Sequence, residues 1–132
     1  MRFTHHLPPV LASNNPRHHV GPARARYQRT LDEMVLRTIS ERNRRFWHPI
    51  AGAATVFLDT YVADERGVDV DATAKCVLDS LQHGGALAND KQVSMLVARR
   101  IVGVGSPRLD VLVIPEERSL WSVVDLFWRG EE

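Results

Sequence analysis

Apolar residues return along the chain at two different spacings. After Ala23 they recur every three or four positions, which predicts an amphipathic helix that runs to about Phe46. Its apolar positions are Tyr27, Leu31, Met34, Val35 and Ile39. From Ala53 to Val62 the residues alternate with a period of two, and this period predicts a strand.

The remaining chain predicts a loop, a second helix and two further strands. Residues 8–22 contain three separate proline sites, so a loop is expected there. Residues 71–83 have helical spacing and are followed by two glycines, which commonly end helices. Residues 93–102 and 109–114 alternate like strands, and the turn formers between them predict a β-hairpin.

The final segment, 115–132, is strongly apolar. Residues 119–128 have the spacing of a helix with one apolar side. Trp121 and Trp128 add more apolar surface than a free tail should expose. This segment is therefore expected to cover either the protein's own core or a partner chain.

Length and composition predict one globular domain over residues 1–132. The chain is 44% hydrophobic and 25% charged, which is ordinary for a domain with its own core. Its single cysteine, Cys76, excludes an internal disulfide and fits a reducing compartment. No apolar run approaches the ~20 residues of a membrane span, and the first residues do not resemble a signal peptide. A cytoplasmic protein without a membrane partner is expected.

Charge is divided unevenly between the two parts of the chain. Residues 1–50 hold nine Lys/Arg against three Asp/Glu, whereas residues 51–132 hold eight against thirteen. A basic first part suits a polyanion, and carboxylates in the second would repel phosphate unless cations lay between them. The alternative is that the arginines only solvate a surface helix. They are Arg24, Arg26, Arg29, Arg37, Arg42, Arg44 and Arg45.

Three carboxylates are the candidate ligands of a divalent cation. Asp69 and Asp71 lie on the same side of an extended segment and can share one cation. Asp71 is expected to start the second helix, with Lys75 and Asp79 following along one stripe and pairing with each other. Asp90 could fold back toward the first two. Hard cations such as Mg²⁺ or Mn²⁺ relieve such repulsion and suit phosphodiester hydrolysis.

Two other chemistries are disfavoured. The pairs His5-His6 and His18-His19 are adjacent in sequence, which suits a single tetrahedral zinc site poorly. Cys76 is expected on the side of its helix away from both the charged and the apolar stripe. A nucleophilic role would need a nearby base that the sequence does not show, so a spectator thiol is predicted.

Three stretches together carry a family resemblance. Residues 69–75 resemble the pattern Asp-x-Asp-Asn-x-x-Lys, residues 78–81 read Leu-Asp-Ser-Leu, and Asn89-Asp90 precedes a strand. This arrangement is similar to the RusA family of Holliday junction resolvases, which are small endodeoxyribonucleases. The similarity covers about residues 7–114, and the tail has no recognised counterpart.

The resemblance implies a homodimeric α/β (α+β) domain, with helices packed on a mixed sheet, that cuts four-way DNA junctions with Mg²⁺ or Mn²⁺. Two symmetric incisions need two sites related by one two-fold axis. DNA binding should weaken as salt rises, because basic side chains contact phosphates. The implied metal ligands are Asp69, Asp71 and Asp90, with Lys75 near the phosphate; the DNA contacts are Asn14, Asn15, Arg17, Arg24, Arg26 and Arg29.

Two departures from the family pattern leave alternatives open. Ala72 stands where Asn is usual, and Asn89 replaces the first residue of an acidic pair. Neither removes an assigned ligand, so activity is expected. One alternative is a catalytically impaired DNA-binding or assembly protein. The other is a globular chain whose acidic run only caps a helix, and this would neither bind nor cut junctions.

Overall fold

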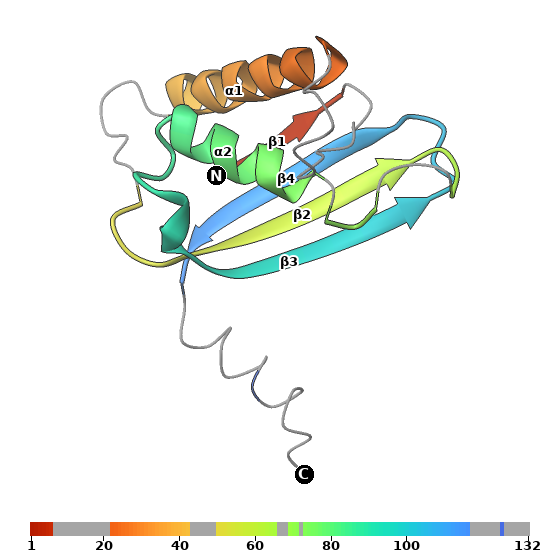
Figure 1. Cartoon of the computed structure of the whole chain (residues 1–132). Coiled ribbons are helices and arrows are strands. Elements are labelled where there is room, and N and C mark those ends of the chain that lie inside the picture. The colour runs from red at the N-terminus through yellow and green to blue at the C-terminus, as the bar shows by residue number, and fades with distance from the viewer. Residues whose placement is uncertain (7–21, 43–49, 66–68, 72, 117–124, 126–132) are drawn as a thin grey trace.

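The computed structural model describes residues 1–6, 22–42, 50–65, 69–71, 73–116 and 125 (Figure 1). Within these ranges neither α-helix is long and apolar enough to cross a membrane. In chain order the elements are β1 (Arg2–His5), α1 (Pro22–Arg42), β2 (Ala54–Val62), α2 (Ala74–His83), the short 3-10 helix η1 (Asp90–Gln92), β3 (Val93–Val102) and β4 (Arg108–Pro115).

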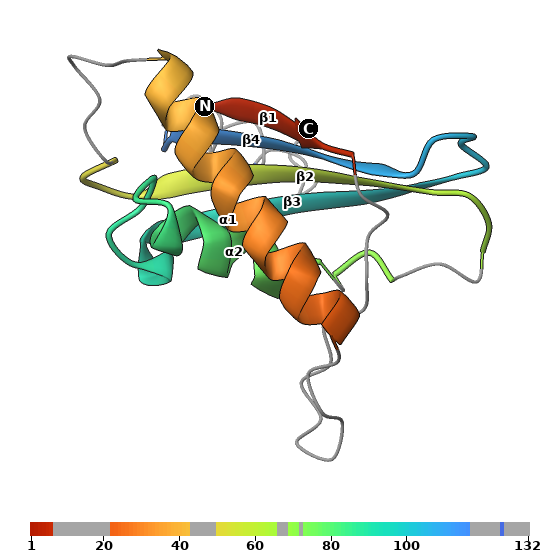
Figure 2. The same cartoon turned by 90° about the horizontal axis from the view of Figure 1, so that it is seen from above.

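The strands form one mixed sheet in the order β1-β4-β2-β3. β2 runs parallel to β3 and antiparallel to β4, and β4 runs antiparallel to β1. Both helices lie on one face of the sheet (Figure 2). In the described part of the chain the opposite face has no helix over it. The predicted α+β domain with helices packed on a mixed sheet is confirmed.

The predicted hairpin between β3 and β4 is wrong, because β2 lies between these strands. The connection crosses the end of β2, where the N–H groups of Gly103 and Val104 both donate to the carbonyl of Val62. β2 has alternate positions fully buried, whereas every position of β3 is half-buried or exposed. β2 is the more buried of the two because, as an inner strand, it is covered on both edges and one face.

Element boundaries differ from the sequence pattern at two places. β1 was not predicted; it is a four-residue strand that buries Phe3 and pairs with β4. α2 begins at Ala74 rather than Asp71, and the carbonyl of Asp71 accepts the Ala74 N–H in the preceding turn. The first helix is confirmed over 23–42. The predicted extension to residue 46 and the predicted tail helix, apart from Asp125, lie outside the described residues.

The core lies between the helices and the sheet. α1 contributes the fully buried Leu31 and Val35, and α2 contributes Val77 and Leu81. Cys76 is also fully buried among these residues, so its predicted place away from the apolar stripe is wrong. α2 is buried over more than its one apolar stripe because α1 packs against a second side of it. The remaining core positions are Phe3, Tyr27, Ala54, Val56, Leu58, Ala74, Ala86, Leu87, Leu109, Val111 and Val113.

A polar network joins the two helices. The Asp32 carboxylate accepts hydrogen bonds from Ser80 Oγ at 2.5 Å and from Gln28 Nε2 at 3.1 Å. Its other oxygen lies 3.3 Å from Nδ1 of His83. Ser80 is completely buried, so Asp32 supplies the acceptor that its hydroxyl would otherwise lack.

Replacing Asp32 with Ala is expected to lower the free energy of unfolding by about 1–3 kcal/mol, because a buried hydroxyl loses a charged acceptor. Urea denaturation measures this difference. Glu33→Ala is the matched control, since Glu33 is the exposed neighbour on the same helix. It should change stability by less than about 0.5 kcal/mol. Equal effects of the two substitutions would contradict a structural role for the network.

His5 is a buried histidine with one unpaired nitrogen. Its Nε2 lies 2.9 Å from the hydroxyl of Thr30, which itself donates to the carbonyl of Tyr27. Nε2 must therefore be the donor, which leaves Nδ1 as a bare lone pair without a partner among the described residues. Burial, followed by the nearby His6, lowers the pKa of His5 below its usual 6.5.

Because the unfolded chain binds a proton on His5 more readily than the folded chain does, stability should fall as the pH drops below about 6.5. The fall should stop below the depressed folded-state pKa. Thermal unfolding between pH 7 and pH 5 measures this slope. His5→Gln should flatten it, whereas His6→Gln, which removes only the smaller of the two causes, should reduce it less. The same slope in both variants would exclude His5 as its origin.

Candidate active site

The Asp69–Asp71 segment lies in the connection from β2 to α2. Asp69, Val70 and Asp71 are all exposed. The segment is anchored at its end by Thr73, whose buried hydroxyl lies 3.1 Å from that of Thr60 on β2. The anchor holds the start of α2 against the sheet and leaves both carboxylates in solvent.

Lys75 lies in the first turn of α2, close in sequence to this acidic pair. Its Nζ is 3.4 Å from Asp79 Oδ2, one helical turn further on. The predicted pairing of these two residues is confirmed. Because the lysine side chain is 53% exposed, its charge also remains available to a phosphate outside the helix.

Asp90 is held in a different place, at the start of η1. Its backbone N–H donates to Gln82 Oε1 in the last turn of α2, at 3.3 Å. Asn89 caps η1, because its side chain accepts the N–H of Lys91 and the Gln92 side chain accepts the N–H of Asn89. Asn and Asp serve equally well at such a cap, so Asn89 preserves the local structure that an aspartate would provide.

Asp90 does not fold back toward Asp69 and Asp71 within one copy of the chain, contrary to the expectation. The helix between them has ten residues and is therefore about 15 Å long. The acidic pair follows the carboxyl end of β2, whereas Asp90 precedes the amino end of the parallel strand β3. Among the described residues no three His, Cys, Asp or Glu side chains gather closely enough to hold a metal ion.

The donor chemistry nevertheless fits a hard divalent cation. Asp69 and Asp71 supply carboxylate oxygens, which Mg²⁺ and Mn²⁺ prefer, and both are open to solvent. One copy of the chain thus holds two of the three predicted ligands in one exposed segment, which is followed in the sequence by Lys75 in the first turn of α2. The third predicted ligand lies at the other end of α2.

The basic face of α1 is present, but its arginines differ in exposure. Arg26, Arg29 and Arg37 are exposed, and Arg24 is half-buried. Burial raises the pKa of the Cys76 thiol, and a hydrogen bond from Arg24 opposes that rise. A nearby hollow of about 360 Å³ is lined in part by Arg26 and Arg37. The predicted contacts Asn14, Asn15 and Arg17 lie outside the described residues.

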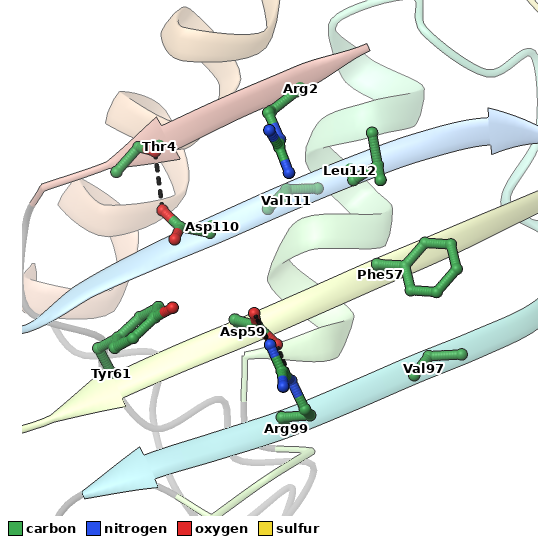
Figure 3. A pocket seen from close by; sticks show the side chains of 10 residues that line it. All are labelled: Arg2, Thr4, Phe57, Asp59, Tyr61, Val97, Arg99, Asp110, Val111 and Leu112. Carbon is green, nitrogen blue, oxygen red and sulfur yellow. Dashed lines mark hydrogen bonds and ion pairs between the residues drawn. The ribbon is translucent and has the colours of Figure 1, made fainter.

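The helix-free face of the sheet carries a charged row that sequence reasoning missed (Figure 3). Asp59 on β2 accepts two hydrogen bonds from Arg99 on β3, at 2.8 and 2.6 Å, and this arginine lowers the pKa of Asp59. Asp110 accepts from Thr4 at 2.7 Å. Both carboxylates that line this 670 Å³ hollow are therefore paired. Alternation within β2 could have placed Asp59 on this face, but only the strand order reveals its partner.

Taken together, a mixed sheet with two helices, an exposed acidic loop and a basic helix face define a small α+β domain suited to a polyanionic substrate. The family model of endodeoxyribonuclease RusA matches residues 23–114, well over half of the chain. The chain therefore belongs to the RusA endodeoxyribonuclease family, a family of Holliday junction resolvases that depend on divalent metal ions. No curated protein matches the chain.

Proposed function

We propose that the protein resolves four-way DNA junctions by paired, symmetric, Mg²⁺- or Mn²⁺-dependent incisions, acting in the cytoplasm in DNA recombination and repair. The observation that carries the proposal is the exposed Asp69–Asp71 pair beside Lys75, in a chain of the RusA family. Bound metal would supply charge neutralisation at phosphorus and an activated water. Lys75 adds a fixed positive charge for the scissile phosphate. The Asp79 carboxylate, one helical turn away, orients the lysine side chain.

The position of Asp90 supports an active site built from two copies of the chain. Within one copy α2 separates Asp90 from the acidic pair. A two-fold axis can place Asp90 of the partner subunit beside Asp69 and Asp71, and it generates the second site at the same time. The homodimer that paired incision needs would then also complete the ligand set.

The basic face of α1 would hold the DNA. Arg26 and Arg29 are exposed on it, and Arg24, Arg17, Asn14 and Asn15 are the other proposed contacts. Arginine side chains neutralise phosphates without reading sequence, which suits an enzyme that recognises the shape of a branch. The acidic pair directly precedes α2, and hydrogen bonds from Ser80 to Asp32 and from Gln28 to the Cys76 carbonyl join α2 to α1, which carries the basic face.

The decisive experiment is cleavage of a labelled four-way junction, compared with a linear duplex of the same sequence, in Mg²⁺, Mn²⁺ or chelator. Paired metal-dependent cuts near the branch, absent from the duplex, are expected. Binding of the junction without cutting in either metal would indicate a binding or assembly protein instead. Neither binding nor cutting would leave the acidic segment with a purely structural role.

A further inference from the structure

Gln92, the last residue of η1, has a side-chain amide that is fully hydrogen-bonded. Its Oε1 accepts the backbone N–H groups of Ala88 and Asn89, at 2.8 and 3.0 Å. Its Nε2 donates to the carbonyl of Ile50, and to that of Gly52 at 2.9 Å. A primary amide offers two donors and one oxygen with two lone pairs, so all four positions are used. A half-buried side chain bound in this way is held in one orientation.

These four hydrogen bonds join two segments that are far apart in the sequence. Residues 50–52 lead into β2, whereas residues 84–92 connect α2 to β3. The same two segments meet where the N–H of Ile50 donates to the carbonyl of Ala86 and where Ile50 forms a parallel bridge with Leu87. Ala86 and Leu87 are each 1% exposed. The connection is therefore fixed at one end by the core and at the other by Gln92.

Asp90 lies inside this fixed connection, and only its backbone is bound. Its N–H donates to Gln82 Oε1, and the next N–H, that of Lys91, donates to Asn89 Oδ1. The Asp90 carboxylate is exposed and makes no hydrogen bond or ion pair with the described residues. A ligand held in place before the cation arrives loses little conformational freedom on binding. A fixed backbone with an open carboxylate suits that requirement.

We infer that Gln92 is a positioning residue of the metal site. By fixing the backbone on both sides of Asp90 it sets the place of that carboxylate, and with it the affinity for the divalent cation. The inference rests on the proposed function, because it takes Asp90 as a ligand. Gln82 assists from α2 with one hydrogen bond of 3.3 Å, so its contribution is smaller. The competing explanation is that Gln92 only stabilises the fold, which would leave the metal affinity unchanged.

Gln92→Met tests the inference, because it keeps the length of the side chain and removes all four hydrogen bonds. The affinity for Mn²⁺, measured by electron paramagnetic resonance of the free ion, should fall by about 10–100-fold, the usual effect of losing a residue that orients a metal ligand. Junction cutting should then need more Mn²⁺ and recover when Mn²⁺ is in excess. Amide hydrogen exchange at Ala88 and Asn89 should be faster even without metal.

Three further variants calibrate this result. Thr4→Val is the matched control, because it removes a 2.7 Å side-chain hydrogen bond to Asp110 on β4, away from β3. Its Mn²⁺ affinity should stay within about twofold of wild type. Gln82→Met should lose less affinity than Gln92→Met, and Asp90→Asn should lose at least as much. Urea denaturation shows whether each variant folds and how much stability it has lost.

A Gln92→Met protein with wild-type Mn²⁺ affinity would overturn the inference, whatever its stability. Gln92→Asn keeps the amide but is one methylene shorter, so it should also weaken Mn²⁺ binding. It replaces Gln92→Met in the comparison if the apolar variant does not fold.

The measurements separate this inference from the proposed function. A wild-type protein that binds Mn²⁺ but does not cut junctions would contradict the function alone, and the Gln92 comparison would still decide the inference. Junction cutting with the same Mn²⁺ dependence in wild type and Gln92→Met would contradict the inference alone. A wild-type protein that does not bind Mn²⁺ would overturn both.

Discussion

Asp71→Asn is expected to reduce junction cutting by at least about 10²–10³-fold, the scale of losing one preorganised charged group at a reacting phosphate. Binding of the junction in chelator should be retained, because the exposed arginines of α1 are unchanged and only one negative charge is removed. Initial rates of cleavage in Mg²⁺ and Mn²⁺, together with gel-shift titration in chelator, measure the two effects separately.

Glu65→Gln is the control for Asp71→Asn. Glu65 is an exposed carboxylate in the same β2–α2 connection, so the substitution makes the same change of charge close by. Its cutting rate should stay within about twofold of wild type, as is usual for a surface change away from the chemistry. Equal loss in the two variants would mean that the total negative charge of the β2–α2 connection, rather than metal binding by Asp71, sets the cutting rate. Loss of both binding and cutting in Asp71→Asn would point to misfolding.

Co-refolding Asp71→Asn with Asp90→Asn is expected to restore cutting that neither protein shows alone. In a mixed dimer with shared sites, one site carries both substitutions and the other carries none. Random mixing makes half of the dimers mixed, so about a quarter of the wild-type sites are intact. The products should be single nicks, because each active dimer has one working site. Denaturing gels of a junction labelled on opposite strands distinguish nicks from paired cuts.

A mixture of Asp69→Asn with Asp71→Asn serves as the control for this experiment. These residues share one loop, so every site in the mixed dimer loses one ligand and no cutting should return. If the Asp71→Asn and Asp90→Asn mixture also stays inactive, each site is built within one subunit. In that case a rearrangement of α2 or of its connections would have to bring Asp90 to the acidic pair.

The candidate site was only partly predictable from sequence. The Lys75–Asp79 pair depends on residues four positions apart, and the structure keeps it. Asp69 and Asp71 are exposed as expected for a cation site, but residues 70 and 71 form a turn rather than the predicted extended segment. The expected return of Asp90 depended on the path of the chain beyond α2. The chain beyond α2 runs to the amino end of β3, whereas the acidic pair follows the carboxyl end of the parallel strand β2. Local spacing therefore carried no information about the distance from Asp90 to Asp69 and Asp71.

Sequence by itself determined the helices, three of the four strands and the residue types of the acidic loop, because hydrophobic period and turn formers act over a few neighbouring positions. Only the tertiary structure decided the strand order, the burial of Cys76 and the exposed edge at β3. β2 lies between β3 and β4, which are neighbours in the sequence, and β1 is a strand because it pairs with β4. These outcomes follow from competition among distant segments for the same buried position, which no local pattern records.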